Sequence, residues 1–133
     1  MNSKGFTLIE LLVSLAIVAI LAALITYTAL EYINRGKDAA VQGGLSLLVT
    51  GGESWYDKND NSYCGFCDSL AVRNTRTSIA SEIKCNENQD TCNAWAACAA
   101  EFLTPEKAFC VDNRGVKKEI KLEECTDEII ACP

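Results

Sequence analysis

The hydrophobic pattern of the chain changes near residue 30. Residues 11–30 form a run of twenty positions without a formal charge, and most of them are apolar. A helix needs about 20 such residues to cross the roughly 30 Å hydrocarbon core of a bilayer. Glu10 stands at the start of this run. On insertion scales, placing an acidic side chain in a membrane helix costs roughly 2.5–3.5 kcal/mol. The pattern therefore predicts a membrane-spanning helix with one acid whose position indicates a function.

The helical pattern continues beyond the apolar run. A stripe at helical spacing is formed by Leu45, Leu48, Val49 and Trp55. Glycine pairs at 43–44 and 51–52 weaken a helix interior by about 1 kcal/mol per glycine, without ending it. We predict one helix over residues 6–56, with residues 6–30 in the membrane and a polar stop at residues 57–62.

The rest of the chain predicts a mixed lobe over residues 57–133. We expect a short helix near residues 78–83 and an alanine-rich helix over residues 92–103, capped by Asp90 or Thr91. Residues 108–122 read as strand, turn and strand. The predicted fold class is α+β, a long helix followed by a small lobe with a β-hairpin.

All eight cysteines lie in this lobe, which predicts a disulfide scaffold in an oxidising compartment. They are Cys64, Cys67, Cys85, Cys92, Cys98, Cys110, Cys125 and Cys132. Four bridges allow 105 pairings, and the sequence does not choose among them. Each bridge typically adds about 2–4 kcal/mol to the free energy of unfolding, and a lobe of this size buries too little apolar surface to be stable without such bridges.

Charge and composition exclude several functions. The formal net charge is −6, so bulk binding to nucleic acid is not expected, and the few lysines of residues 117–121 stand among glutamates. The chain has no histidine and no nucleophile motif, so we expect no enzyme, no catalytic residue and no cofactor.

Three other sites are weaker interpretations. Cys64 and Cys67 have the spacing of a thioredoxin-type redox pair, but they follow a helix and a polar turn. A zinc site would need a second close pair of ligands. Asp57, Asn59 and Asn61 match the first positions of a calcium loop, whose turn glycine and final glutamate are missing. We therefore expect no metal.

Residues 4–10 read KGFTLIE. This segment resembles the class III signal of type IV pilins and pseudopilins, and part of the lobe is similar to small bacterial pilin-like proteins. The resemblance implies a leader over residues 1–5, cleavage after Gly5 by a prepilin peptidase, and methylation of the new amino terminus at Phe6. It also implies that Glu10 neutralises the Phe6 amine of a neighbouring copy during assembly.

The resemblance further implies the partners and the location. The chain would insert in the cytoplasmic membrane as a single-pass precursor, meet an assembly platform, and polymerise with itself into a surface pilus used in adhesion, motility or DNA uptake. A minor pilin or pseudopilin of a secretion or competence complex is the nearest alternative, and the sequence does not separate these. On spacing alone, Phe6 and Glu10 of one helix could also pair within one chain.

Three other interpretations stay open. The first residues could be a secretory signal peptide cut near residues 26–29. The protein could be a membrane-tethered disulfide oxidoreductase that uses Cys64 and Cys67, or a disulfide-rich binding module.

Overall fold

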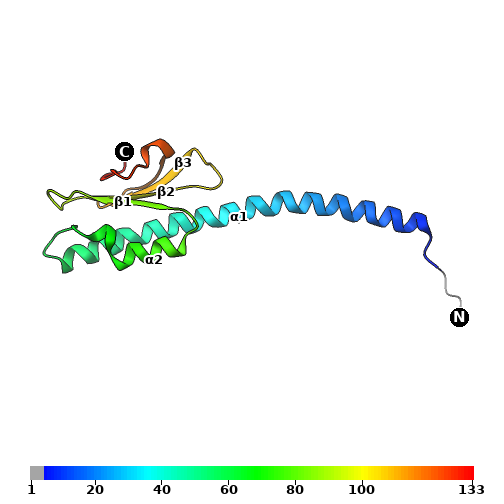
Figure 1. Ribbon diagram of the computed structural model, residues 1–133, viewed down its shortest axis with the longest axis horizontal. Helices are drawn as coiled ribbons and strands as arrows, with labels where there is room; N and C mark the ends of the chain where they lie inside the picture. Colours follow the sequence, from blue (N-terminus) through cyan, green and yellow to red (C-terminus); the bar gives the residue numbers. More distant parts are fainter. Residues whose placement is uncertain (1–4) are drawn as a thin grey trace. The chain divides into compact units, whose positions relative to one another are not determined.

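The computed structural model describes residues 5–133, so residues 1–4 of the predicted leader lie outside its described part. A long helix precedes a four-stranded antiparallel sheet, which confirms the predicted α+β class (Figure 1). By its internal contacts the chain divides into two units, one that ends at Ile33 and one that comprises Asn34–Pro133. The elements are α1 (Leu8–Lys58), η1 (Phe66–Asp68), α2 (Leu70–Ser78), β1 (Ile83–Glu87), β2 (Trp95–Ala100), β3 (Lys107–Asp112), β4 (Lys117–Lys121) and η2 (Leu122–Glu124).

The first unit buries none of its described side chains. Every residue from Gly5 to Ile33 is exposed, and the large apolar side chains keep between 53% and 77% of their surface. By length and composition, α1 contains a stretch that can cross a membrane. Apolar exposure on this scale marks a surface that something else covers.

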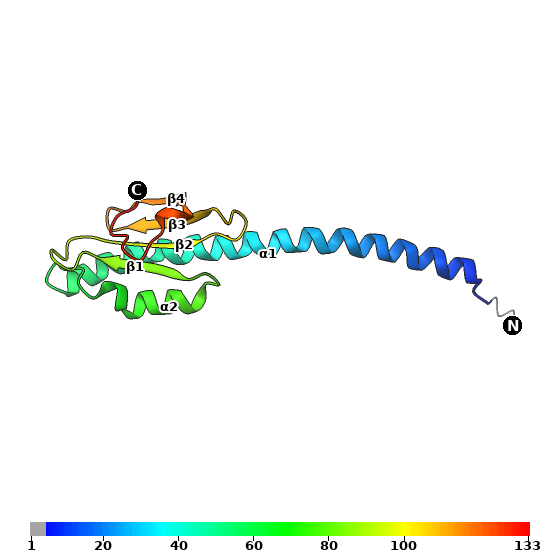
Figure 2. The same ribbon diagram turned by 45° about the horizontal axis from the view of Figure 1, so that its top comes forward.

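The second unit has three layers. In Figures 1 and 2 the second part of α1 lies with α2 on one face of the sheet, and the last residues of the chain lie on the other. The strands pair in the order β1-β2-β3-β4, each antiparallel to the next. Because side chains alternate along a strand, Trp95, Ala97 and Ala99 pack into the cluster with the helices. Ala96 and Cys98 pack into a second cluster with the tail.

Helix α1 contributes the predicted stripe to the first of these clusters. Leu45 and Leu48 are fully buried, and Val49 and Trp55 pack against the cluster from its margin. The helix ends at Lys58, inside the predicted polar stop.

A buried acid fixes the loop after β2 onto α1. Asp38 accepts hydrogen bonds from the backbone N–H groups of Phe102 (2.6 Å) and Leu103 (3.0 Å). One turn further along α1, Gln42 donates to Glu101 at 2.9 Å. Bonds to an ionised acceptor are about twice as strong as neutral ones, so this short loop is held at two points.

The segment after α1 returns to the helix through a tyrosine pair. The rings of Tyr56 and Tyr63 lie 4.7 Å apart between centroids, and the Tyr63 hydroxyl donates to Glu53 at 3.1 Å. Burial, together with this bond, raises the pKa of Tyr63 to about 12, so its hydroxyl stays protonated and keeps donating.

The predicted helix over residues 92–103 is wrong, because this segment contains strand β2. All but the last residue of β2 are buried, and the strand pairs on both edges. Alanine favours helices only as a weak prior, which tertiary packing overrides. Here small side chains suit a strand covered on both faces. Asp90 and Thr91 cap no helix, since their N–H groups donate to the Asn88 side chain in a turn.

The short helix predicted near residues 78–83 is also misplaced. Helix α2 ends at Ser78, and Ser69 caps its start by accepting from the N–H of Val72. The predicted hairpin is confirmed as β3 and β4, and Gly115 in its turn has a φ of +78°, which favours glycine.

The glycines of α1 have different surroundings. A β-carbon on residue 52 would lie 2.8 Å from the indole of Trp95, and one on residue 44 would lie 2.9 Å from Ile79. Around Gly43 nothing lies within 4 Å of that position. Trp95 is fully buried, and its ring nitrogen has no hydrogen-bond partner among residues 5–133, so close packing on Gly52 holds it in place.

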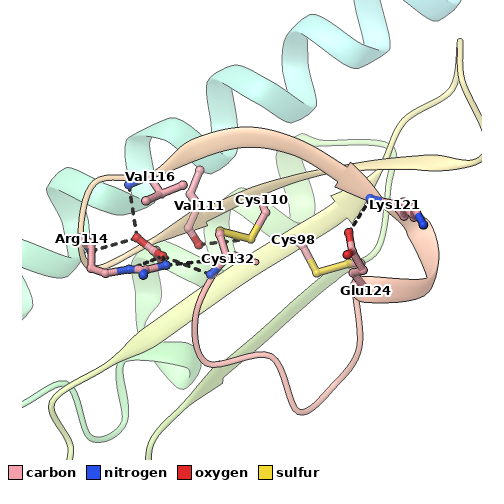
Figure 3. Close-up of a disulfide and its surroundings, with 10 residues drawn as sticks. Cys98, Cys110, Val111, Arg114, Val116, Lys121, Glu124 and Cys132 are labelled. Atoms are coloured by element: carbon pink, nitrogen blue, oxygen red, sulfur yellow. Dashed lines mark hydrogen bonds and ion pairs between the residues drawn. A yellow bond between two sulfur atoms is a disulfide. The ribbon is translucent and has the colours of Figure 1, made fainter.

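The tail is held by two bridges and a buried carboxylate, all shown in Figure 3. Cys98 bonds Cys125 and Cys110 bonds Cys132. The carboxylate is that of Asp112, whose side chain is fully buried and accepts from the N–H of Cys132 (3.1 Å) and from Arg114 (Nε, 2.9 Å).

The same contacts set the ionisation of this acid. Burial alone would raise the pKa of Asp112, but the hydrogen bonds from Arg114 and from the backbone of Cys132 and Val116 outweigh it. The pKa therefore lies below its ordinary value, and the charge is kept at neutral pH.

We predict that Gly52→Ala destabilises the lobe by about 1–3 kcal/mol, since the added methyl group overlaps the Trp95 ring. Gly43→Ala is the matched control and should stabilise the same helix by about 1 kcal/mol, because alanine is the better helix former. Urea unfolding of the full chain in detergent, followed by tryptophan fluorescence, measures both. Equal effects of the two variants would contradict the packing role of Gly52.

We predict that Asp112→Asn costs about 1.5–3 kcal/mol at pH 7, the range for bonds to a charged group. A carboxyl whose folded pKa is lowered stabilises the fold above its unfolded pKa, and this stabilisation is lost as the pH falls through the folded value. The difference between the variant and the parent should therefore begin to shrink below about pH 4, the ordinary pKa of an aspartate, and should vanish only below the lower folded pKa. Melting temperatures across pH measure this.

The control is Glu119→Gln, which removes the exposed ion pair with Lys107 and should leave the melting temperature unchanged. A difference between Asp112→Asn and the parent that stays constant down to acid pH would exclude an ionised Asp112 as the source of the stability.

Candidate functional site

The candidate site is the start of α1 with the residues just before it. Gly5, Phe6 and Thr7 precede the helix, which begins at Leu8, two residues later than predicted. Phe6 is 77% exposed, and nothing lies within 4 Å of a β-carbon placed on Gly5. No residue among 5–133 therefore covers the peptide bond between Gly5 and Phe6.

Glu10 bonds within its own chain. Its Oε2 accepts from the backbone N–H of Thr7 (2.9 Å) and from the Thr7 hydroxyl (2.7 Å). The Glu10 N–H in turn donates to the Thr7 hydroxyl oxygen at 3.3 Å. This reciprocal arrangement is a capping box, which satisfies two of the N–H groups that a helix start leaves without partners.

Thr7 is the functional neighbour that the sequence analysis missed. The Thr-x-x-Glu spacing before an apolar run is itself a capping-box signal and would have identified it. The box also changes one expectation. Because the helix begins at Leu8, Phe6 lies outside it, and the expectation that Phe6 and Glu10 stand at i and i+4 of one helix is wrong.

The capping box defines what Glu10 can still do. A carboxylate has about four acceptor positions, and Thr7 bonds to only one of its two oxygens. Glu10 therefore keeps capacity for another donor while its rotamer is fixed near the end of the helix. The N-terminal end of the helix dipole also favours a negative charge at this place.

The serine and the two threonines of the apolar run bond to their own helix. Ser14 donates to the carbonyl of Glu10 (2.7 Å), Thr26 to that of Ala22 (2.8 Å), and Thr28 to that of Ile25 (3.0 Å). Hydroxyls satisfied in this way do not need water, so they suit a helix in a hydrocarbon environment.

The first two bridges of the lobe contradict a redox role for Cys64 and Cys67. Cys64 bonds Cys92 and Cys67 bonds Cys85, so the two do not form the pair that a thioredoxin-type site requires. The Glu87 carboxylate accepts from the N–H groups of Gly65 and Cys67, both at 2.9 Å, which makes this loop a structural turn.

The calcium interpretation finds no support in the loop itself. Asn59 donates its side-chain N–H to the carbonyl of Trp55 at 2.8 Å, which closes the end of α1. Between Gly5 and the C-terminus, no three acidic, histidine or cysteine side chains stand close enough to hold a metal ion.

Comparison with known proteins supports the resemblance at the N-terminus. Residues 1–26 match the family described as the prokaryotic N-terminal methylation motif. Over 62 residues the chain is 45% identical to the type IV wide pilus major component PilA4 of Thermus thermophilus, a match that covers 47% of each chain. Over 69 residues it is 32% identical to the type IV major pilin protein PilA of Myxococcus xanthus, which covers 52% of this chain and 31% of that one.

The chain therefore spans about half the length of the first curated relative that it matches and about a third of the second. No solved structure matches it. The resemblance to type IV pilins is confirmed, and both relatives are described as pilus components and not as enzymes.

We predict that peptide mapping without reductant recovers the pairs Cys64–Cys92 and Cys67–Cys85. Structural bridges of this kind resist mild reductants, so alkylation of the folded protein in dilute glutathione should label no cysteine. A peptide that links Cys64 to Cys67, or rapid labelling of either residue, would restore the oxidoreductase interpretation.

Proposed function

We propose that this protein is a structural subunit of a type IV pilus-like filament. The subunits would polymerise through the part of α1 that belongs to the first unit and ends at Ile33. The observation that carries the proposal is the exposed apolar helix of that unit, with Glu10 as the acid at its start. The methylation motif and the two pilin relatives support it.

The same surface suits two environments in turn. Before assembly, residues 11–30 lie in the membrane, where lipid covers the apolar side chains. After assembly, neighbouring helices cover them and exclude both lipid and water. Burying a large apolar side chain is worth about 1.5–3 kcal/mol relative to water, so a helix with this surface favours either cover over exposure.

Cleavage between Gly5 and Phe6 by a prepilin peptidase would create the cation that Glu10 lacks. An acid in an apolar environment needs a partner, and the Phe6 amine of the next copy supplies a charge-assisted one. Thr7 holds the Glu10 carboxylate in place until that amine arrives. The register between copies follows from this pair.

The lobe would face outward from the filament, and any role in adhesion, motility or DNA uptake would belong to its surface. A minor pilin or pseudopilin would use the same N-terminal chemistry and differ in abundance.

The test is the intact mass and N-terminal sequence of the protein in membranes and in sheared surface material. We expect a chain that starts at Phe6, carries a methyl group on its amine, and is abundant in the sheared fraction. A chain that starts at Met1, or one cut near residues 26–29, would contradict the proposal.

The variant Glu10→Gln separates processing from assembly, because it keeps the shape of the side chain and removes the charge. It should still be cut after Gly5 but should fall at least tenfold in the sheared fraction, which corresponds to about 1.4 kcal/mol or more. The matched control is Glu123→Gln on the lobe, where the acid is exposed and the sheared fraction should not change. Normal assembly of Glu10→Gln would exclude the charge pair.

A further inference from the structure

The exposed stretch of α1 up to Ile33 contains one kind of polar side chain that its own helix does not satisfy. Ser14, Thr26 and Thr28 donate to backbone carbonyls of α1. The hydroxyls of Tyr27 and Tyr32 make no hydrogen bond to any residue among 5–133, and the two residues are 77% and 73% exposed. Their hydroxyls need acceptors outside the chain.

The positions of these tyrosines along α1 match the dimensions of a bilayer. From the start of α1 at Leu8 to Tyr27 the helix rises roughly 29 Å at 1.5 Å per residue, close to the roughly 30 Å of a hydrocarbon core. Tyr32 lies about 7.5 Å further along, and each headgroup layer is roughly 5–7 Å thick. The two rings therefore mark the inner and outer limits of one headgroup layer.

The chemistry of the side chain fits the same place. A tyrosine presents an apolar ring and a polar tip, and such residues are enriched where a helix leaves the hydrocarbon for water. Five residues along a helix place the two rings on different sides of it, so they contact lipid around the helix and not in one groove.

We propose that Tyr27 and Tyr32 bind the phospholipid headgroup layer on the lobe side of the membrane and set the depth of the unassembled subunit. This inference rests on the proposed membrane-inserted precursor. It adds the lipid contact and the two residues that make it.

The test uses the full chain with 3-fluorotyrosine, reconstituted in phosphatidylcholine–phosphatidylglycerol vesicles that carry a nitroxide at a chosen depth of the acyl chain. Fluorine NMR reports how strongly each nitroxide broadens each tyrosine signal. Tyr27→Phe and Tyr32→Phe assign the signals. Tyr56 and Tyr63, which pack against each other in the lobe, serve as internal controls.

We expect a nitroxide next to the headgroup to broaden Tyr27 and Tyr32 several-fold more than a nitroxide near the methyl end of the chain, and the control signals to change with neither. Strongest broadening of Tyr27 by the deep nitroxide, or no lipid effect on Tyr32, would overturn the inference. Flotation with the vesicles is scored in parallel. If the chain floats and either of these two results is found, this inference alone is overturned. If the chain does not float, the proposed membrane precursor is contradicted as well.

Discussion

The apolar surface of the first unit is the constraint on which the rest of this protein depends. Between Gly5 and Ile33 no described side chain is buried, although most of them are large and apolar. The backbone of α1 satisfies its own hydrogen bonds, and the hydroxyls of Ser14, Thr26 and Thr28 bond to it as well. What the surface lacks is cover, which lipid or other copies of the chain can provide. On the proposed account it receives first one and then the other.

The lobe is built to fold without that cover. Its first cluster joins α1, α2 and one face of the sheet, and its second joins the other face to the tail. The four disulfides all connect residues between Cys64 and Cys132, so none of them reaches α1. The helix is held to the lobe by packing on Gly52 and by the bonds that Asp38 accepts. Covalent restraint is thus kept to the part that would face an oxidising environment.

The sequence predicted those elements whose signal is local. The long helix follows from an apolar run and a stripe at helical spacing, and the hairpin follows from two short strands around Gly115. Strand β2 could not be predicted in this way, because alanine suits a helix and only pairing with β1 and β3 makes a strand. The disulfide pairing depends on the same long-range register, which spacing does not reveal.

The candidate site was predicted to a similar extent. Glu10 stands out because an acid beside an apolar run is costly. The capping-box spacing would have identified Thr7, which bonds to Glu10. The helix starts only at Leu8, so Phe6 lies outside the helix that carries Glu10. Gly52 was interpreted as a weakness of the helix, whereas the structure shows that Trp95 occupies the space that a side chain would need.

The most direct measurement is an electron cryomicroscopy map of the sheared surface material, at a resolution that shows side chains. We expect filaments in which the helices of neighbouring copies pack along residues 11–30, with a Glu10 carboxylate in hydrogen-bond contact with the Phe6 amine of the next copy. A filament in which Glu10 contacts only its own Thr7, or one whose centre is built from other chains, would contradict this expectation.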